Sequence, residues 1–131
     1  MGFTLIEVIV AIFILSTGIL AVLAIFPLGI QIMDFSETVT TSNYLAGSKI
    51  EEVISLSYPD ISVGDITETS LPYPFSEYRR ETKISYVDPT NNFQEVPNDT
   101  GIKKIEVTVS WSSALKINKK SIELSTFIIQ R

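Results

Sequence analysis

The sequence predicts an α+β protein, in which one long N-terminal α-helix packs by its C-terminal half on a small antiparallel sheet of about three to four strands. Three observations predict this class. An uncharged apolar run extends from Val8 to Met33, an amphipathic segment at helical spacing continues it to Ser57, and residues that alternate between apolar and polar follow after Tyr78. We therefore expect two parts, an apolar helix and a globular head.

The run from Val8 to Met33 is long enough to cross a membrane. Of its 26 residues, 20 are apolar, and as a helix it measures about 39 Å, against about 30 Å of bilayer hydrocarbon. A buried core helix is one alternative, but the rest of the chain has too little apolar surface to surround it. A cleaved signal peptide is another, but the first basic residue is Lys49 and the run is too long. We expect a membrane-spanning helix that the mature protein keeps.

Three residues distinguish this helix from a plain anchor. Glu7 stands at its start, and a carboxylate beside an apolar run is costly in lipid, which makes it a functional candidate. The alternative is a residue at headgroup level that the helix dipole favours. Pro27 removes a backbone hydrogen bond and, with Gly29, marks a helix break. That break is either a place where other helices pack or a simple kink.

The segment 34–57 is predicted to continue the helix as part of the head. A single helix then extends from Phe3 to Ser57, and the Tyr58-Pro59 pair ends it. Residues 58–77 are predicted to be a loop. The face of the helix expected to point inward consists of Phe35, Val39, Ala46, Ile50, Val53 and Ile54.

The antiparallel sheet is predicted over 78–130. Its first strand is expected at Tyr78–Val87, and Asp88–Gly101 is expected to be loop or turn because it is rich in Pro, Asn and Gly. Two further strands, joined by residues 112–119, are predicted because apolar and polar residues alternate along them. The side chains expected to point inward are those of Ile105, Val107, Val109, Trp111, Ile122, Leu124, Thr126 and Ile128. Such a sheet buries little surface alone, so we expect it to pack on the helix.

The composition excludes most catalytic chemistry. The 131 residues include no Cys and no His, which removes disulfides, thiolate nucleophiles, the commonest general base and the usual metal ligands. The net charge of −5 argues against a surface that binds nucleic acid. We therefore predict no enzymatic activity, no cofactor and no metal site, and we do not expect DNA as a partner.

The N-terminal motif resembles that of a known family. Gly2-Phe3-Thr4-Leu5-Ile6-Glu7-Val8, followed by an uncharged helix, is similar to the signal of type IV pilins and type II secretion pseudopilins. The resemblance implies cleavage by prepilin peptidase between Gly2 and Phe3, so that residues 1–2 are the residual leader, and N-methylation of Phe3. It also implies that Glu7 meets the Phe3 ammonium of a neighbouring subunit and sets the axial register of a filament.

Looser patterns extend the resemblance to V-type minor pilins and I-type minor pseudopilins. They lie at the end of the helix, around Lys49 to Tyr58, and in the expected closing hairpin, at Val107–Trp111 and Leu124–Ile128. The resemblance implies a ladle-like fold, with a transmembrane and assembly helix at 3–33 and a periplasmic or extracellular head at 34–131.

The implied function is that of a structural subunit, a minor pilin or minor pseudopilin, with a priming or tip role as one possibility. Such a chain spans the cytoplasmic (inner) membrane once before assembly and is part of a periplasmic or extracellular filament afterwards. Its implied partners are other pilin or pseudopilin subunits, prepilin peptidase, the inner-membrane assembly platform and, before assembly, membrane lipid. Two alternatives stay open: a monomeric membrane-anchored extracytoplasmic binding domain, and a DNA-uptake minor pilin.

Overall fold

The computed structural model describes residues 2, 4–111 and 120–130. It contains one long helix, a short 3₁₀ turn and five strands, which confirms the predicted α+β class. The chain divides into two compact units, Met1–Thr38 and Val39–Arg131. In chain order the elements are α1 (Leu5–Ile54), the turn η1 (Tyr58–Asp60), β1 (Gly64–Glu68), β2 (Tyr78–Asp88), β3 (Gln94–Val96), β4 (Ile102–Trp111) and β5 (Lys120–Ile129).

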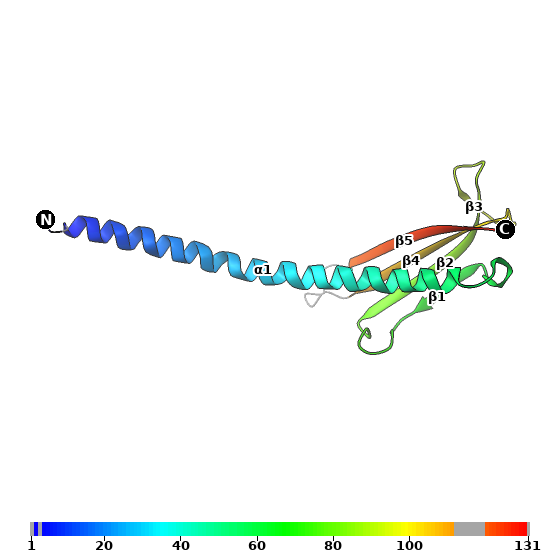
Figure 1. Cartoon of the computed structure of the whole chain (residues 1–131), viewed down its shortest axis with the longest axis horizontal. Coiled ribbons are helices and arrows are strands. Elements are labelled where there is room, and N and C mark those ends of the chain that lie inside the picture. The colour runs from blue at the N-terminus through cyan, green and yellow to red at the C-terminus, as the bar shows by residue number, and fades with distance from the viewer. Residues whose placement is uncertain (1, 3, 112–119, 131) are drawn as a thin grey trace. The chain divides into compact units, whose positions relative to one another are not determined.

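The sheet is antiparallel throughout. Its strand order is β1-β2-β4-β5, and β3 pairs with β2 beside this path. In the centre, Ile84 of β2 lies opposite Ile105 of β4, which lies opposite Thr126 of β5. Figure 1 shows β4 and β5 lying side by side with the C-terminal part of α1.

The hydrophobic core lies between the sheet and the helical residues of the second unit. Ile105, Val107 and Val109 have no exposed surface, and Trp111 is buried beside them, as the alternation along β4 predicts. From the helix, Leu45, Ala46 and Val53 enter the same cluster. The β5 positions predicted to point inward are half-buried.

The predicted inward face of the helix is partly wrong. Ala46 and Val53 are buried, but Phe35 and Ile54 are exposed by 47% and 44%. Ile54 lies about 100° around the helix from Val53, which turns it off the sheet. The stripe that is buried instead contains Ser42, Leu45, Ala46 and Val53.

Two predicted loops contain strands, so the expectation of three to four strands is wrong. The segment 58–77 includes η1 and β1, and the segment 88–101 includes β3. β1 and β3 contain Gly, Asp, Glu and Gln, residues that are poor strand formers. They become strands because both pair with β2, at Gly64↔Ile84 and at Tyr86↔Val96 among other positions. The sheet therefore begins at Gly64, while the predicted connection 112–119 lies outside the described residues.

Candidate assembly surface on the N-terminal helix

Thr4 and Glu7 form the start of α1. The backbone N–H of Glu7 donates to the carbonyl oxygen of Thr4 at 3.1 Å and to its Oγ1 at 3.4 Å. This is the N-cap arrangement, and Thr-x-x-Glu is the sequence signature of a capping box. The sequence analysis gave Thr4 no role, although the Thr-x-x-Glu signature predicts a helix start at this residue. The cap starts the helix at Leu5 and thereby places Glu7 in its first turn.

Glu7 is exposed and lies at the positive end of the helix dipole. Among the residues that the structure describes, none forms an ion pair with its carboxylate. Phe3, whose ammonium the family resemblance implies as the partner of Glu7, lies outside the described residues, whereas Gly2 is exposed.

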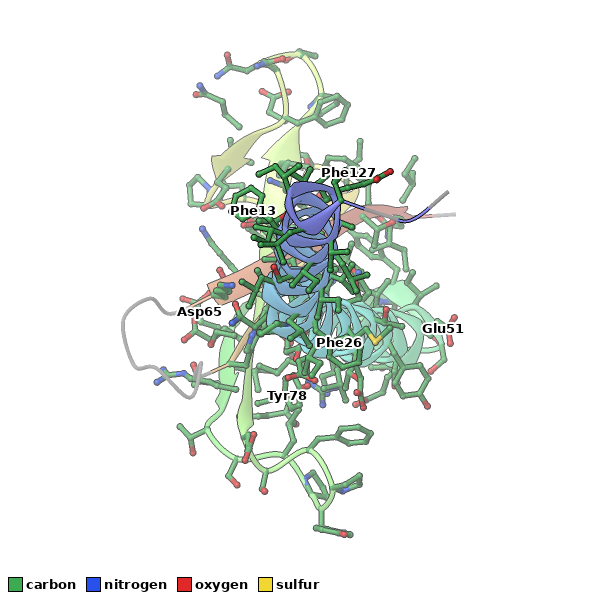
Figure 2. The ribbon with its side chains drawn as sticks, turned by 90° about the vertical axis from the view of Figure 1, so that its left-hand side faces the viewer. Phe13, Phe26, Glu51, Asp65, Tyr78 and Phe127 are labelled. Atoms are coloured by element: carbon green, nitrogen blue, oxygen red, sulfur yellow. The ribbon has the colours of Figure 1, made fainter. Side chains whose placement is uncertain are left out.

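The helical residues of the first unit present an apolar surface from Leu5 to Met33. Every large hydrophobic side chain from Leu5 to Met33 is exposed, and the exposed fractions run from 46% at Val8 to 80% at Leu5. Figure 2 shows Phe13 and Phe26 projecting from the helix. By length and composition, α1 is able to cross a membrane. A surface of this kind is stable only in lipid or against other apolar surfaces.

The polar residues inside the apolar run make hydrogen bonds to their own helix. Ser16 Oγ donates to the carbonyl oxygen of Ile12 at 2.7 Å and lies 3.0 Å from that of Phe13. Thr17 Oγ1 likewise lies within hydrogen-bond distance of the carbonyl oxygens of Phe13, at 3.0 Å, and of Ile14, at 2.9 Å. Because the helix itself satisfies both hydroxyls, neither needs a partner in lipid.

Gly18 and Gly29 lie in two open apolar grooves on the helix surface. One groove is lined by Ile14, Leu15, Gly18, Ile19, Val22 and Leu23, and the other by Val22, Ile25, Phe26, Gly29, Ile30 and Met33. A Cβ atom at either glycine would meet nothing within 4 Å. The helix passes through Pro27 and Gly29 without interruption. The predicted role of these two residues in packing or kinking stays a prediction.

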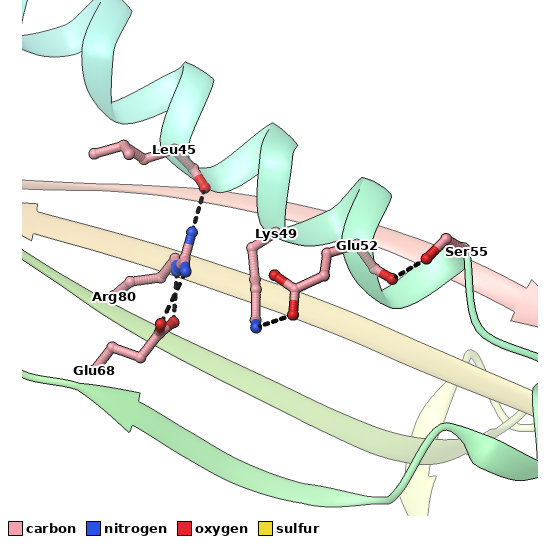
Figure 3. Close-up of polar contacts among 6 residues, drawn as sticks. All are labelled: Leu45, Lys49, Glu52, Ser55, Glu68 and Arg80. Atoms are coloured by element: carbon pink, nitrogen blue, oxygen red, sulfur yellow. Dashed lines mark hydrogen bonds and ion pairs between the residues drawn. The ribbon is translucent and has the colours of Figure 1, made fainter. Parts of the chain in front are cut away.

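In the head, ion pairs involve most of the basic side chains around β2 and β4. Arg79 pairs with Glu81, Lys83 with Glu95, and Lys104 with Glu106. Of these ion-paired side chains, Arg80 is the least exposed. Its Nε donates to Glu68 Oε2 at 2.7 Å, and a terminal nitrogen donates to the carbonyl oxygen of Leu45 at 3.1 Å (Figure 3). Each of these basic side chains thus lies beside a carboxylate of the same sheet.

Lys103 of β4 has a buried side chain, a position to which the sequence analysis assigned no role. Its Nζ donates to the carbonyl oxygens of Tyr58 and Ile61, both at 2.7 Å, and lies 4.0 Å from the centre of the Tyr58 ring. The Tyr58 hydroxyl donates to Asp99 Oδ1 at 2.6 Å. Burial and this hydrogen bond raise the pKa of Tyr58, while the same bond lowers the pKa of Asp99. The group attaches the turn η1 to β4.

Within the described part of the chain, no three His, Cys, Asp or Glu residues lie close enough to hold a metal ion. The N-terminal helix, with Glu7 in its first turn and its apolar surface uncovered, is therefore the feature whose function needs explaining. Comparisons of the chain with protein-family models, with curated proteins and with solved structures give no match.

Proposed function

We propose that this chain is a pilin-like structural subunit, a minor pilin or minor pseudopilin. It is inserted in the cytoplasmic membrane, processed by prepilin peptidase between Gly2 and Phe3, and assembled by helix packing into a filament. The filament is a type IV pilus or a type II secretion pseudopilus.

The observation that carries this proposal is the uncovered apolar helix that follows the Gly2–Val8 motif. Nineteen large hydrophobic side chains between Leu5 and Met33 are exposed, and no charged residue interrupts them after Glu7. Lipid covers this surface before assembly, and the helices of neighbouring subunits cover it afterwards. The open grooves at Gly18 and Gly29 support close approach of such helices, because small residues allow backbones to come near each other.

Glu7 supports assembly more than simple anchoring. A carboxylate near the edge of the hydrocarbon is costly, and an anchor has no need of it. In a filament the carboxylate meets the new amino terminus of a neighbouring subunit, Phe3. In a low-dielectric helix bundle, a pair of opposite charges loses little free energy on burial, whereas burial of an unpaired charge costs several kcal/mol. One axial register is then favoured over all others.

The head keeps its own core, which supports its transfer from membrane to filament as a folded unit. The core cluster consists of residues from Leu45 onward, and its largest fully buried side chains include Ile61, Ile105 and Val107. Folding of the head therefore needs no side chain of the apolar run. The run remains available to lipid or to other subunits.

The mass of the mature protein tests this proposal. We expect protein extracted from membranes of a host with prepilin peptidase to lack Met1 and Gly2 and to carry one methyl group on Phe3. The matched control is the same chain from a host without the peptidase, which should keep Gly2 and carry no methyl group. A mature protein that retains Gly2 in both hosts would instead favour the monomeric membrane-anchored domain and contradict the proposal.

A further inference from the structure

Among the described residues, the strand β5 forms one edge of the sheet, because it pairs with β4 and with no other strand. The opposite edge, β1, is half as long and carries Asp65 and Glu68. From Leu124 to Ile129 β5 contains neither a charged residue nor a proline. Proteins commonly protect edge strands with charges, prolines or short length, because an unprotected edge pairs with other chains. The C-terminal half of β5 lacks these features.

The hydrogen-bond register shows which residues of β5 face the open side. The N–H of Gln130 donates to the carbonyl oxygen of Gly101 at 2.9 Å, so these two residues form a hydrogen-bonded pair. In an antiparallel ladder, bonded and non-bonded pairs alternate. The even-numbered residues of β5 therefore bond to β4. The backbone N–H and C=O groups that face outward belong to Ser121, Glu123, Ser125, Phe127 and Ile129.

A groove lies beside the same end of the strand. It is lined by the end of α1, the turn η1 and the last residues of β5, among them Ile54, Tyr58, Pro59 and Ile128. On the other face of the sheet the Phe127 ring lies 5.0 Å from that of Phe93, and both rings are almost half exposed. A strand added at this edge would therefore meet the Phe93–Phe127 pair on one face of the sheet and, on the other, a groove lined by both apolar and polar residues.

We propose that the β5 edge binds an extended, uncharged segment of a partner protein, which adds to the sheet as a sixth strand. The outward backbone groups require an extended occupant, because only a strand matches a ladder of donors and acceptors at this spacing. The Phe93–Phe127 pair favours apolar side chains on the face of this strand that meets the two rings. This interaction goes beyond the proposed assembly through α1 and does not depend on it.

Self-pairing of two β5 strands does not fit the sequence of the strand. Two β5 edges related by two-fold symmetry pair antiparallel. In such a pair centred on Ser125, Glu123 of each copy would lie opposite Phe127 of the other, which sets a charged side chain against an apolar ring. The occupant is therefore a segment of another kind.

Amide hydrogen exchange on the full chain in detergent micelles tests the proposal, with a blocked peptide of alternating Val and Thr as the probe. Without the peptide, the N–H groups of Ser121, Ser125 and Phe127 should exchange fast and those of Leu124 and Thr126 slowly. With the peptide, the fast set should become protected. A peptide with proline at its central position is the matched control and should protect none of them.

Two variants make the result specific. Ser125→Pro removes an outward N–H that does not bond to β4, so it should abolish protection while Trp111 fluorescence stays native; Ser125→Ala should behave as the parent chain. Absence of protection in the parent chain, or equal protection in Ser125→Pro, would overturn the proposal. A disulfide formed efficiently between two Ser125→Cys chains without peptide would overturn it as well, because it would show that a second copy occupies the edge.

Discussion

Arg80 holds both carboxylate oxygens of Glu68. Its Nε donates to Oε2 at 2.7 Å and a terminal guanidinium nitrogen donates to Oε1 at 2.9 Å, while the other terminal nitrogen reaches the carbonyl oxygen of Leu45 at 3.1 Å (Figure 3). One side chain of β2 thus joins β1, the sheet centre and the helix. The Arg80 side chain is 11% exposed and that of Glu68 is 32% exposed, so the guanidinium is largely shielded from water while the carboxylate stays partly accessible.

Glu68→Gln should destabilise the head. The substitution keeps the shape of the side chain but removes the charge that Arg80 requires, and hydrogen bonds to charged groups contribute about 1.5–3 kcal/mol each. We expect a loss of about 1–3 kcal/mol in the free energy of unfolding, measured by urea denaturation with Trp111 fluorescence. Glu81→Gln is the matched control, since the Arg79–Glu81 pair is 43% and 46% exposed and such pairs contribute about 0–1 kcal/mol. Equal losses in the two variants would contradict the special role of Glu68.

The same pair predicts a pH dependence of stability. Hydrogen bonds from Arg80 hold the pKa of Glu68 below its ordinary value of 4.5. A carboxyl group whose pKa is lower in the folded state contributes its stability fully above the ordinary pKa and loses it as the pH falls through the folded pKa. The difference in urea midpoint between the parent chain and Glu68→Gln should therefore be constant at neutral pH and shrink below pH 4.5. A difference that does not change with pH would exclude this linkage.

Lys103→Met should detach the turn η1 from β4. Methionine fills much of the same space, but it leaves the carbonyl oxygens of Tyr58 and Ile61 without their donor. Buried acceptors left unpaired cost about 1–3 kcal/mol, which should appear as a lower urea midpoint. Lys104→Met provides the control, because Lys104 pairs with Glu106 on a partly exposed part of the sheet. An unchanged midpoint in Lys103→Met would show that other donors replace the lysine.

Glu7→Ala should allow membrane insertion but impair incorporation into filaments. The charge is needed in the proposed assembly to meet the Phe3 ammonium of a neighbour, not to insert the helix. The measurement compares the amount of the variant in sheared filaments with the amount in the membrane fraction.

Glu7→Gln separates this role from helix capping, because glutamine also completes a capping box with Thr4 but carries no charge. If the charge matters, Glu7→Gln should assemble as poorly as Glu7→Ala. Normal assembly of Glu7→Gln would assign the effect to the cap, and normal assembly of Glu7→Ala would exclude the register role altogether.

Much of the fold follows from periodicity in the sequence. Strict alternation predicted β4 and β5, and the structure has them at Ile102–Trp111 and Lys120–Ile129. The strand predicted at Tyr78–Val87 ends one residue later, at Asp88. The predicted continuity of the helix is also confirmed, since α1 is unbroken from Leu5 to Ile54. In these elements each residue type agrees with the face it occupies.

The candidate site was predicted less completely. Glu7, Pro27 and Gly29 were singled out for their types and positions, and Gly2 through the resemblance to the pilin signal, but what they do in assembly depends on other molecules. The cap at Thr4 is local and readable as Thr-x-x-Glu. By contrast, the burial of Lys103 has no local signal, because its acceptors at Tyr58 and Ile61 lie more than forty positions away in the chain.

Residue types and their order alone predict an uncharged apolar run at Val8–Met33 that is long enough to span a membrane, a carboxylate just before it, and strands wherever alternation is strict. The folded chain adds that Gly64–Glu68 and Gln94–Val96 are strands, which side of the helix is buried, and which strands form the edges of the sheet among the described residues. The physical reason is that side-chain periodicity is a local property. Strand pairing, by contrast, satisfies backbone groups that every residue has, so even poor strand formers pair when β2 lies beside them.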